Sequence, residues 1–209
     1  MLEKILQKKL VPVADINELE DAVPLAEALL AADLKVIEVT LRTGAAIGCI
    51  EAIRKAVPEM IVGAGTLLDH HLVPRLVDMG IAFAITPGIN PLVVENARRH
   101  NLLIIPGVIT PTEIEQARNL DLKVLKFFPA EAAGGAAMLQ AFAGPYGHTP
   151  IRFVPTGGIK LDNIKSYLDI PCVAAIGGSW FVSAQLLQEK KFDEITRLTG
   201  EALALVNAS

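Results

Sequence analysis

Eight short apolar runs recur along the chain, and longer segments with helical spacing separate them. Runs rich in Val, Ile and Leu are typical of parallel strands buried on both faces. Their alternation with helical segments predicts a parallel α/β fold, and eight is the number of strands that closes a (β/α)8 TIM barrel. The runs lie at Leu10–Ala14, Val36–Leu41, Met60–Ala64, Ala82–Thr86, Leu102–Pro106, Val124–Phe128, Ile151–Pro155 and Val173–Ile176.

An open doubly wound sheet is the competing interpretation of the same pattern. The chain has 209 residues, with no composition shift or linker, so we expect residues 1–209 to form a single barrel domain. TIM barrels typically need about 250 residues. The loops of this chain must therefore be brief, and no large lid is expected.

The segments between the runs carry helix signals. Apolar positions from Leu19 to Leu30 share one helical face, and we expect Asp15 or Asn17 to cap that helix, although Pro24 lies inside it. Clearer signals are helix starts at Asp69, Thr110 and Asp162 and a stop at Gly80.

Composition excludes several functional classes. The net charge is −4 and the basic residues are scattered, which argues against a nucleic-acid partner. No apolar run is long enough to span a membrane, and the charges within Met1–Lys9 do not suit a secretory signal. Cys49 and Cys172 lie far apart without C-x-x-C spacing, so we expect neither a disulfide nor a metal framework, and a cytoplasmic location.

The histidines do not suggest a metal site. His70 and His71 are adjacent near a helix start, where neighbouring residues do not share a helix face. We interpret them as solvated surface residues. His100 and His148 stand alone in loop contexts.

Two of the apolar runs carry a charged residue at their middle, Glu38 in one and Lys126 in the other. Side chains alternate along a strand, so the run VIEVTLR places Glu38, Thr40 and Arg42 on one face. The other face is apolar and should pack on helices, which leaves the polar face directed into the barrel. By the same argument Lys126 points inward with Val124 and Phe128.

An inward lysine in an apolar strand is costly unless it is paired or neutral. Burial favours the neutral amine, which is the nucleophilic form. A buried Lys126–Glu38 pair that serves structure alone is the simpler alternative, but such pairs rarely add stability over apolar ones. The two residues together favour chemistry.

Glycine pairs follow the last two runs, as Thr156-Gly157-Gly158 and Gly177-Gly178-Ser179. Glycine lets backbone N–H groups approach an anion, and these loops form the usual phosphate site of TIM barrels. Ser179 would add a hydroxyl donor or cap a helix. Thr66 ends the third strand, at the edge where barrel active sites lie.

Seven motifs, in order along almost the whole chain, resemble the 2-keto-3-deoxy-6-phosphogluconate (KDPG) aldolases, which are often also active on 4-hydroxy-2-oxoglutarate. The motifs are VIEVTLRT (residues 36–43), IVGAGTL (61–67), FAITPG (83–88), IIPG (104–107), LKFFPAE (125–131), FVPTGGI (153–159) and AIGGSW (175–180). The galactonate-specific relatives depart from PTGGI and IGGSW, so the gluconate epimer is favoured.

The resemblance implies a cofactor-free, metal-independent class I aldolase, a cytoplasmic homotrimer that cleaves KDPG to pyruvate and glyceraldehyde 3-phosphate. Lys126 would be the Schiff-base lysine and Glu38 the general acid/base. Arg42, Thr66 and Pro87 would line the pyruvate end of the substrate, and Gly157, Gly158 and Ser179 would hold the phosphate. The other residues expected to bind substrate are Phe128, Thr156, Gly177 and Gly178. Glu131 is given no catalytic role, and Trp180 is interpreted as packing.

Two other functions would use the same loops. A ribulose-phosphate-type isomerase would share the glycine pairs but has no use for an imine-forming lysine. A non-catalytic phosphosugar sensor would need neither Lys126 nor Glu38. The same chemistry on another 2-keto acid is a closer rival.

Overall fold

The strands of this structure are parallel throughout the part of the chain that is described. The computed structural model describes residues 1–208. A strand lies at or beside each of the eight predicted runs. The strand segments are β1 (Leu10–Ala14), β2 (Val36–Thr40), β3 (Ile61–Gly65), β4 (Phe83–Ile85), β5 (Leu103–Ile105), β6 (Gly107–Val108), β7 (Val124–Phe127), β8 (Arg152–Pro155) and β9 (Ile176–Gly178).

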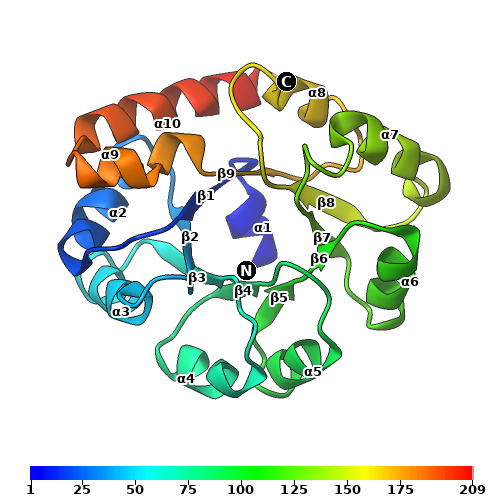
Figure 1. The fold of residues 1–209 in the computed structure, drawn as a ribbon, viewed down its shortest axis with the longest axis horizontal. Coiled ribbons are helices and arrows are strands. Elements are labelled where there is room, and N and C mark those ends of the chain that lie inside the picture. The colour runs from blue at the N-terminus through cyan, green and yellow to red at the C-terminus, as the bar shows by residue number, and fades with distance from the viewer. Residues whose placement is uncertain (209) are drawn as a thin grey trace.

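Within residues 1–208 the strands form two sheets, in the orders β5-β4-β3-β2-β1-β9 and β6-β7-β8. Isolated bridges from Phe153 to Val173 and from Thr156 to Gly177 link β8 with the β9 segment. At the other edge the chain passes from β5 to β6 through Pro106, whose carbonyl accepts a hydrogen bond from the Lys126 N–H at 2.8 Å. The protein is thus an α/β fold whose parallel sheet curls around a central axis (Figure 1).

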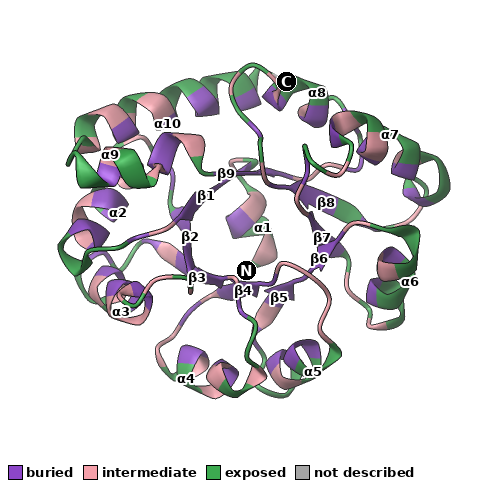
Figure 2. Ribbon diagram, in the orientation of Figure 1, coloured by how far each residue is buried: buried purple, intermediate pink, exposed green. Residues whose placement is uncertain are grey.

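Apart from α1 (Leu2–Leu6), the helices lie outside the strands and present their exposed residues outward (Figure 2). The α-helices are α1 (Leu2–Leu6), α2 (Ala22–Ala31), α3 (Ala46–Ala56), α4 (Val73–Asp78), α5 (Pro91–Arg99), α6 (Pro111–Asn119), α7 (Gly135–Tyr146), α8 (Ile164–Leu168), α9 (Ala184–Gln188) and α10 (Phe192–Asn207). Short 3-10 helices are η1 (Leu19–Asp21), η2 (His70–Leu72) and η3 (Trp180–Val182). None of the helices within residues 1–208 combines the length and apolar character needed to cross a membrane.

Three of the predicted helix signals are confirmed. Thr110 forms a capping box with Glu113 at the start of α6, and Asp69 accepts a hydrogen bond from the His71 N–H at the start of η2. Gly80 follows α4 with φ of 73°, a left-handed conformation that favours glycine after a helix. The helix predicted after Asp162 is present as α8, but it begins one residue later than expected, at Ile164, with Asn163 at the cap position and no side-chain cap.

The first long helix differs from its prediction. Neither Asp15 nor Asn17 caps it: η1 and α2 both begin without a side-chain cap. Leu19 was expected on the buried face, but it lies in η1, ahead of the α-helical spacing, and is 54% exposed. Pro24 is tolerated because it lies in the first turn of α2, where a helix needs no N–H donor.

Two strand boundaries also differ. The fifth run was expected to be one strand, but proline cannot donate to the ladder, and the strand is divided at Pro106. The eighth strand lies later than predicted, because Gly177 and Gly178 pair with Val11 and Pro12 of β1. This glycine pair therefore belongs to the strand, and Ser179 is the first residue beyond it.

The N-terminal segment lies at the amino ends of the strands. The side chain of Ile5 on α1 is fully buried there. Met1 borders a hollow with Val36 and Ile61, the first residues of β2 and β3. In Figure 1 this helix lies near the centre of the ring of strands. The chain therefore begins at the end of the fold opposite to the carboxyl ends of the strands.

Candidate active site

A cavity of about 380 Å³ opens at the carboxyl ends of the strands. That volume lies within the range of small-molecule sites. Lys126 and all ten residues predicted to bind substrate lie on its wall. The lining residues are Val13, Thr40, Arg42, Thr66, Pro87, Lys126, Phe128, Thr156, Gly157, Gly158, Ile159, Gly177, Gly178 and Ser179.

Lys126 and Glu38 meet in the interior beside this cavity. The Lys126 amine lies 3.4 Å from Glu38 Oε1, and the two side chains are 7% and 1% exposed. They come from different sheets: Glu38 lies on β2 between Val13 and Gly63, and Lys126 lies on β7. The amine also lies 5.0 Å from the centre of the Phe128 ring. The inward orientation predicted for both charged residues is confirmed.

Glycine on β3 makes room for the Glu38 carboxylate. A Cβ atom on Gly65 would lie only 2.2 Å from Glu38 Oε1, well inside van der Waals contact. No local turn signal in the sequence distinguishes this glycine from others. The register of β2 with β3 could have identified it, because Thr40 pairs with Gly65. The carboxylate therefore occupies space that a side chain at Gly65 would fill.

Arg42 is held by Asp15, one of the two residues predicted to cap a helix. Arg42 Nη2 donates to Asp15 Oδ2 at 2.6 Å, and Arg42 Nε donates to Thr40 Oγ1 at 3.4 Å. The Thr40 hydroxyl in turn donates to Asp15 Oδ1. Asp15 follows the last residue of β1, so the alternation that identified Glu38 would also have directed Asp15 inward, two residues after Val13.

Thr66 lies on the cavity wall in a strained conformation. Its φ is 56°, a left-handed value that is unusual for a β-branched residue. The neighbouring backbone fixes it, because Leu41 N–H bonds to Gly65 O at 2.8 Å and Leu67 N–H bonds to Ile85 O at 3.1 Å. Strain of this kind concentrates at functional sites.

The glycine pairs form the opposite wall of the cavity. Gly157 and Gly158 have φ of 102° and 80°, values that glycine adopts without strain and that allow N–H groups to form an anion-binding concavity. A Cβ on Gly177 would lie 2.1 Å from Thr156 Oγ1. The end of β9 therefore lies closer to Thr156 than a residue with a side chain would permit.

Ser179 lines that wall, and the Trp180 ring lies beside Gly178. Ser179 occupies the N-cap position of η3, as expected, but its side chain makes no capping hydrogen bond. The Trp180 ring packs against Phe181, with centroids 4.8 Å apart, as expected of a packing residue. A Cβ on Gly178 would overlap this ring.

Tyr167 supports the loop after β7. Its hydroxyl donates to Glu131 Oε1, and the Glu131 N–H bonds to Gly157 O at 3.0 Å. Burial raises the pKa of Tyr167 above its usual value, and the hydrogen bond with Glu131 raises it further. Glu131 therefore contributes to the shape of the Gly157 loop.

A family model described as KDPG and KHG aldolase matches residues 1–198. The chain belongs to this family. It is 46% identical over 193 residues to the KHG/KDPG aldolase of Escherichia coli K12. The aligned region covers 92% of this chain and 90% of the relative.

Two solved structures of KDPG aldolases have the same fold. One, from Legionella pneumophila, holds pyruvate as a covalent carbinolamine intermediate. Its sequence is 39% identical to this chain and its TM-score is 0.88. The alignment covers 91% of this chain and 92% of that one. The other, from Zymomonas mobilis ZM4 with 3-phosphoglycerate, is 35% identical to this chain, with a TM-score of 0.89. The alignment covers 98% of this chain and 97% of that one.

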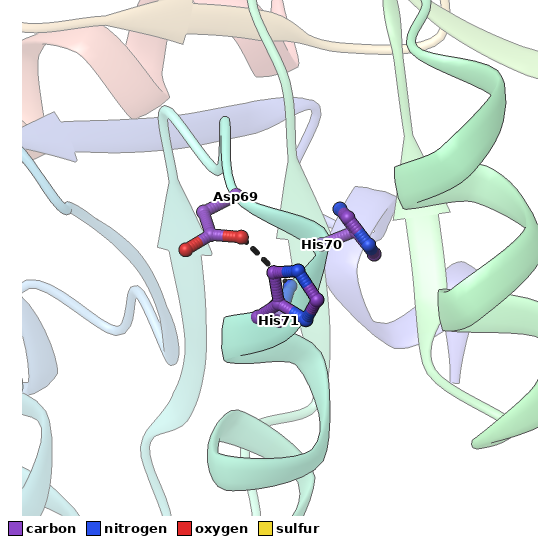
Figure 3. A group of neighbouring side chains, drawn as sticks. All are labelled: Asp69, His70 and His71. Atoms are coloured by element: carbon purple, nitrogen blue, oxygen red, sulfur yellow. Dashed lines mark hydrogen bonds between the residues drawn. The ribbon is translucent and has the colours of Figure 1, made fainter.

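A second cluster of polar side chains lies outside the lining of the aldolase cavity. The possible ligand atoms of Asp69, His70 and His71 lie within 4.8 Å of one another, and the histidine rings are 3.9 Å apart (Figure 3). The expectation that the two adjacent histidines diverge was wrong, because they lie in a tight 3-10 turn. Asp69 already caps this turn, and we assign the cluster no part in the reaction.

Proposed function

We propose that this chain is a metal-independent class I aldolase that cleaves KDPG to pyruvate and glyceraldehyde 3-phosphate, and 4-hydroxy-2-oxoglutarate to pyruvate and glyoxylate. The observation that carries the proposal is the buried Lys126 amine, 3.4 Å from Glu38 at the wall of a substrate-sized cavity. The covalent pyruvate adduct in the Legionella relative supports an imine mechanism. The motifs PTGGI and IGGSW support the gluconate epimer over the galactonate epimer.

The reaction begins when the Lys126 amine adds to the C2 ketone and forms a carbinolamine. Loss of water gives an iminium ion, which withdraws electrons from the C3–C4 bond. Glu38, directly or through a water, takes the proton of the C4 hydroxyl as that bond breaks, releasing the aldehyde and leaving an enamine. Glu38 then returns the proton to C3, and water hydrolyses the iminium to free pyruvate and the amine. General acid/base help of this kind contributes roughly 10²–10⁴-fold to a rate.

The wall near Lys126 suits the pyruvate end of the substrate. Arg42 can hold a carboxylate in a bidentate grip, with Thr66 as a second donor. Pro87 and Phe128 supply apolar surface that keeps water from the amine. Because the iminium is the electron sink, the reaction uses no metal or cofactor.

The glycine wall suits the phosphate of the substrate. Thr156, Gly157 and Gly158 follow β8, whereas Gly177 and Gly178 end β9 and Ser179 is the next residue along the chain. Backbone N–H groups and the Ser179 hydroxyl are suitable donors to a phosphate. The Zymomonas relative, solved with 3-phosphoglycerate, supports a phosphorylated ligand.

Three further features belong to the proposal. The β8–β9 bridges and the passage through Pro106 support one closed (β/α)8 barrel. The single hydrophobic cluster that spans the described residues supports one domain over residues 1–209. The family resemblance alone supports a cytoplasmic homotrimer.

Borohydride reduction in the presence of pyruvate, followed by peptide mapping, tests the mechanism. We expect a reduced pyruvate adduct on the peptide that contains Lys126, and none in Lys126→Met. Absence of an adduct with folded wild-type protein would refute the imine mechanism and favour the isomerase or the sensor. The kcat/KM values of the two epimers and of 4-hydroxy-2-oxoglutarate then determine the substrate.

A further inference from the structure

We infer that Asp15 is a positioning residue that fixes the guanidinium of Arg42 so that its outer edge receives the substrate carboxylate. This inference rests on the proposed function. It adds a residue that none of the aldolase motifs contains, since the first of them begins at Val36.

The fold places Asp15 beside the polar face of β2. β1 pairs with β2 in the register Val13 to Glu38 and Ala14 to Val39. The next residue of each strand is Asp15 and Thr40, and the Asp15 side chain lies on the same side as Val13, which lines the cavity. Asp15 therefore meets Thr40 and Arg42 at the rim of the site.

The contacts of Asp15 occupy one edge of the Arg42 guanidinium. Nε and Nη2 lie along the same edge of the planar group; Nη2 donates to Asp15 and Nε donates to Thr40. The Thr40 hydroxyl is oriented by its own bond to Asp15 Oδ1. Thr40 is almost completely buried, so it anchors this closed set of three side chains.

The other edge of Arg42 is left for a ligand. Among the described residues, Nη1 has no hydrogen-bond acceptor. Nη1 and the second hydrogen of Nη2 form the end of the guanidinium fork, which matches the two oxygens of a carboxylate. Asp15 and Thr40 thus occupy the edge formed by Nε and Nη2. The edge formed by Nη1 and Nη2 stays available in an arginine that lines the cavity.

Exposure indicates orientation rather than stability as the role of this pair. The side chains of Arg42 and Asp15 are 56% and 37% exposed, and exposed ion pairs contribute little to folding. A free arginine side chain samples many rotamers, which a bound carboxylate must restrict. Contacts that already restrict the rotamers of Arg42 in the free protein favour carboxylate binding, because the loss of side-chain entropy no longer occurs on binding.

The test is Asp15→Asn, which keeps the shape of the side chain and removes its charge. We expect the pyruvate concentration that gives half-maximal borohydride trapping to rise about tenfold to a hundredfold. Maximal trapping at saturating pyruvate and the thermal midpoint of unfolding should stay close to those of wild type. Asp33→Asn is the matched control, because Asp33 also pairs with an exposed cation, Lys8, at the far end of the fold.

The partnership is tested by repeating Asp15→Asn in an Arg42→Ala background, where we expect no further loss. A half-saturating pyruvate concentration in Asp15→Asn that is unchanged, or lower than in wild type, would overturn the inference; a lower value would mean that Asp15 only competes with substrate for Arg42. Failure of the wild-type protein to trap pyruvate would instead refute the proposed function.

Discussion

Substitution of Gly65 by alanine should displace the Glu38 carboxylate with little change elsewhere. The new Cβ would lie 2.2 Å from Glu38 Oε1 and 2.7 Å from its Cγ, so the carboxylate must retreat by about 1 Å. Glu38 is 1% exposed and lies 3.4 Å from the Lys126 amine. A retreat of this size removes the proton acceptor from its position, and misplacement of about 1 Å can cost roughly a hundredfold in rate.

The chemical step that depends on Glu38 can be measured without the natural substrate. The Lys126 imine of pyruvate becomes an enamine only when a base removes a methyl proton, so exchange of the pyruvate methyl protons with D2O, followed by NMR, reports on Glu38. We expect exchange in Gly65→Ala to fall roughly a hundredfold, while borohydride still traps pyruvate. Overpacking should lower the free energy of unfolding by about 1–3 kcal/mol.

Gly44→Ala is the control, because a Cβ at Gly44 would meet no atom within 4 Å. It should exchange pyruvate protons at the wild-type rate. If Gly65→Ala folded normally and exchanged protons within about threefold of wild type, the carboxylate would not be the base or would not be confined by Gly65. Either conclusion would refute the inference that Gly65 positions the catalytic base by leaving space for it.

Two further outcomes follow from the same structure. Lys126→Met leaves the buried Glu38 carboxylate unpaired, which should lower the free energy of unfolding by about 3–5 kcal/mol. In urea denaturation, adding Glu38→Gln to this variant should restore most of the lost free energy. A Lys126→Met variant as stable as wild type would contradict this expectation. The pKa of Tyr167 is raised by burial and by Glu131, so its contribution to stability is fully present below the unfolded value of about 10 and is lost as pH rises toward the folded value. Thermal midpoints between about pH 8 and 11 should therefore fall less steeply in Tyr167→Phe than in wild type, and parallel profiles would count against this linkage.

The sequence predicted the parts of the fold that depend on alternation. Glu38 and Lys126 were directed inward because period-two alternation leaves only one polar face on each strand, and the structure places both there. Boundaries were less predictable. The shift of the last strand depends on Gly177 and Gly178 pairing with β1, a long-range contact that local turn signals do not contain.

The missed residues share one cause. Asp15 is one of two residues that the sequence offers as a helix cap, because an aspartate before a helical segment usually has that role. Its actual partners are Thr40, the last residue of β2, and Arg42, two residues further on. Gly65 and the conformation of Thr66 likewise follow from the register between β2 and β3. Such features need knowledge of which strands are neighbours, and not only of where strands lie.

The opposed positions of the chain start and the cavity bear on how the protein can be attached to a support. Met1 lies at the amino ends of β2 and β3, whereas the cavity opens at the carboxyl ends of the strands. A peptide linker fused ahead of Met1 would leave from the face that substrate does not enter. Immobilisation on a bead through such a linker would leave the opening of the cavity directed toward the solution.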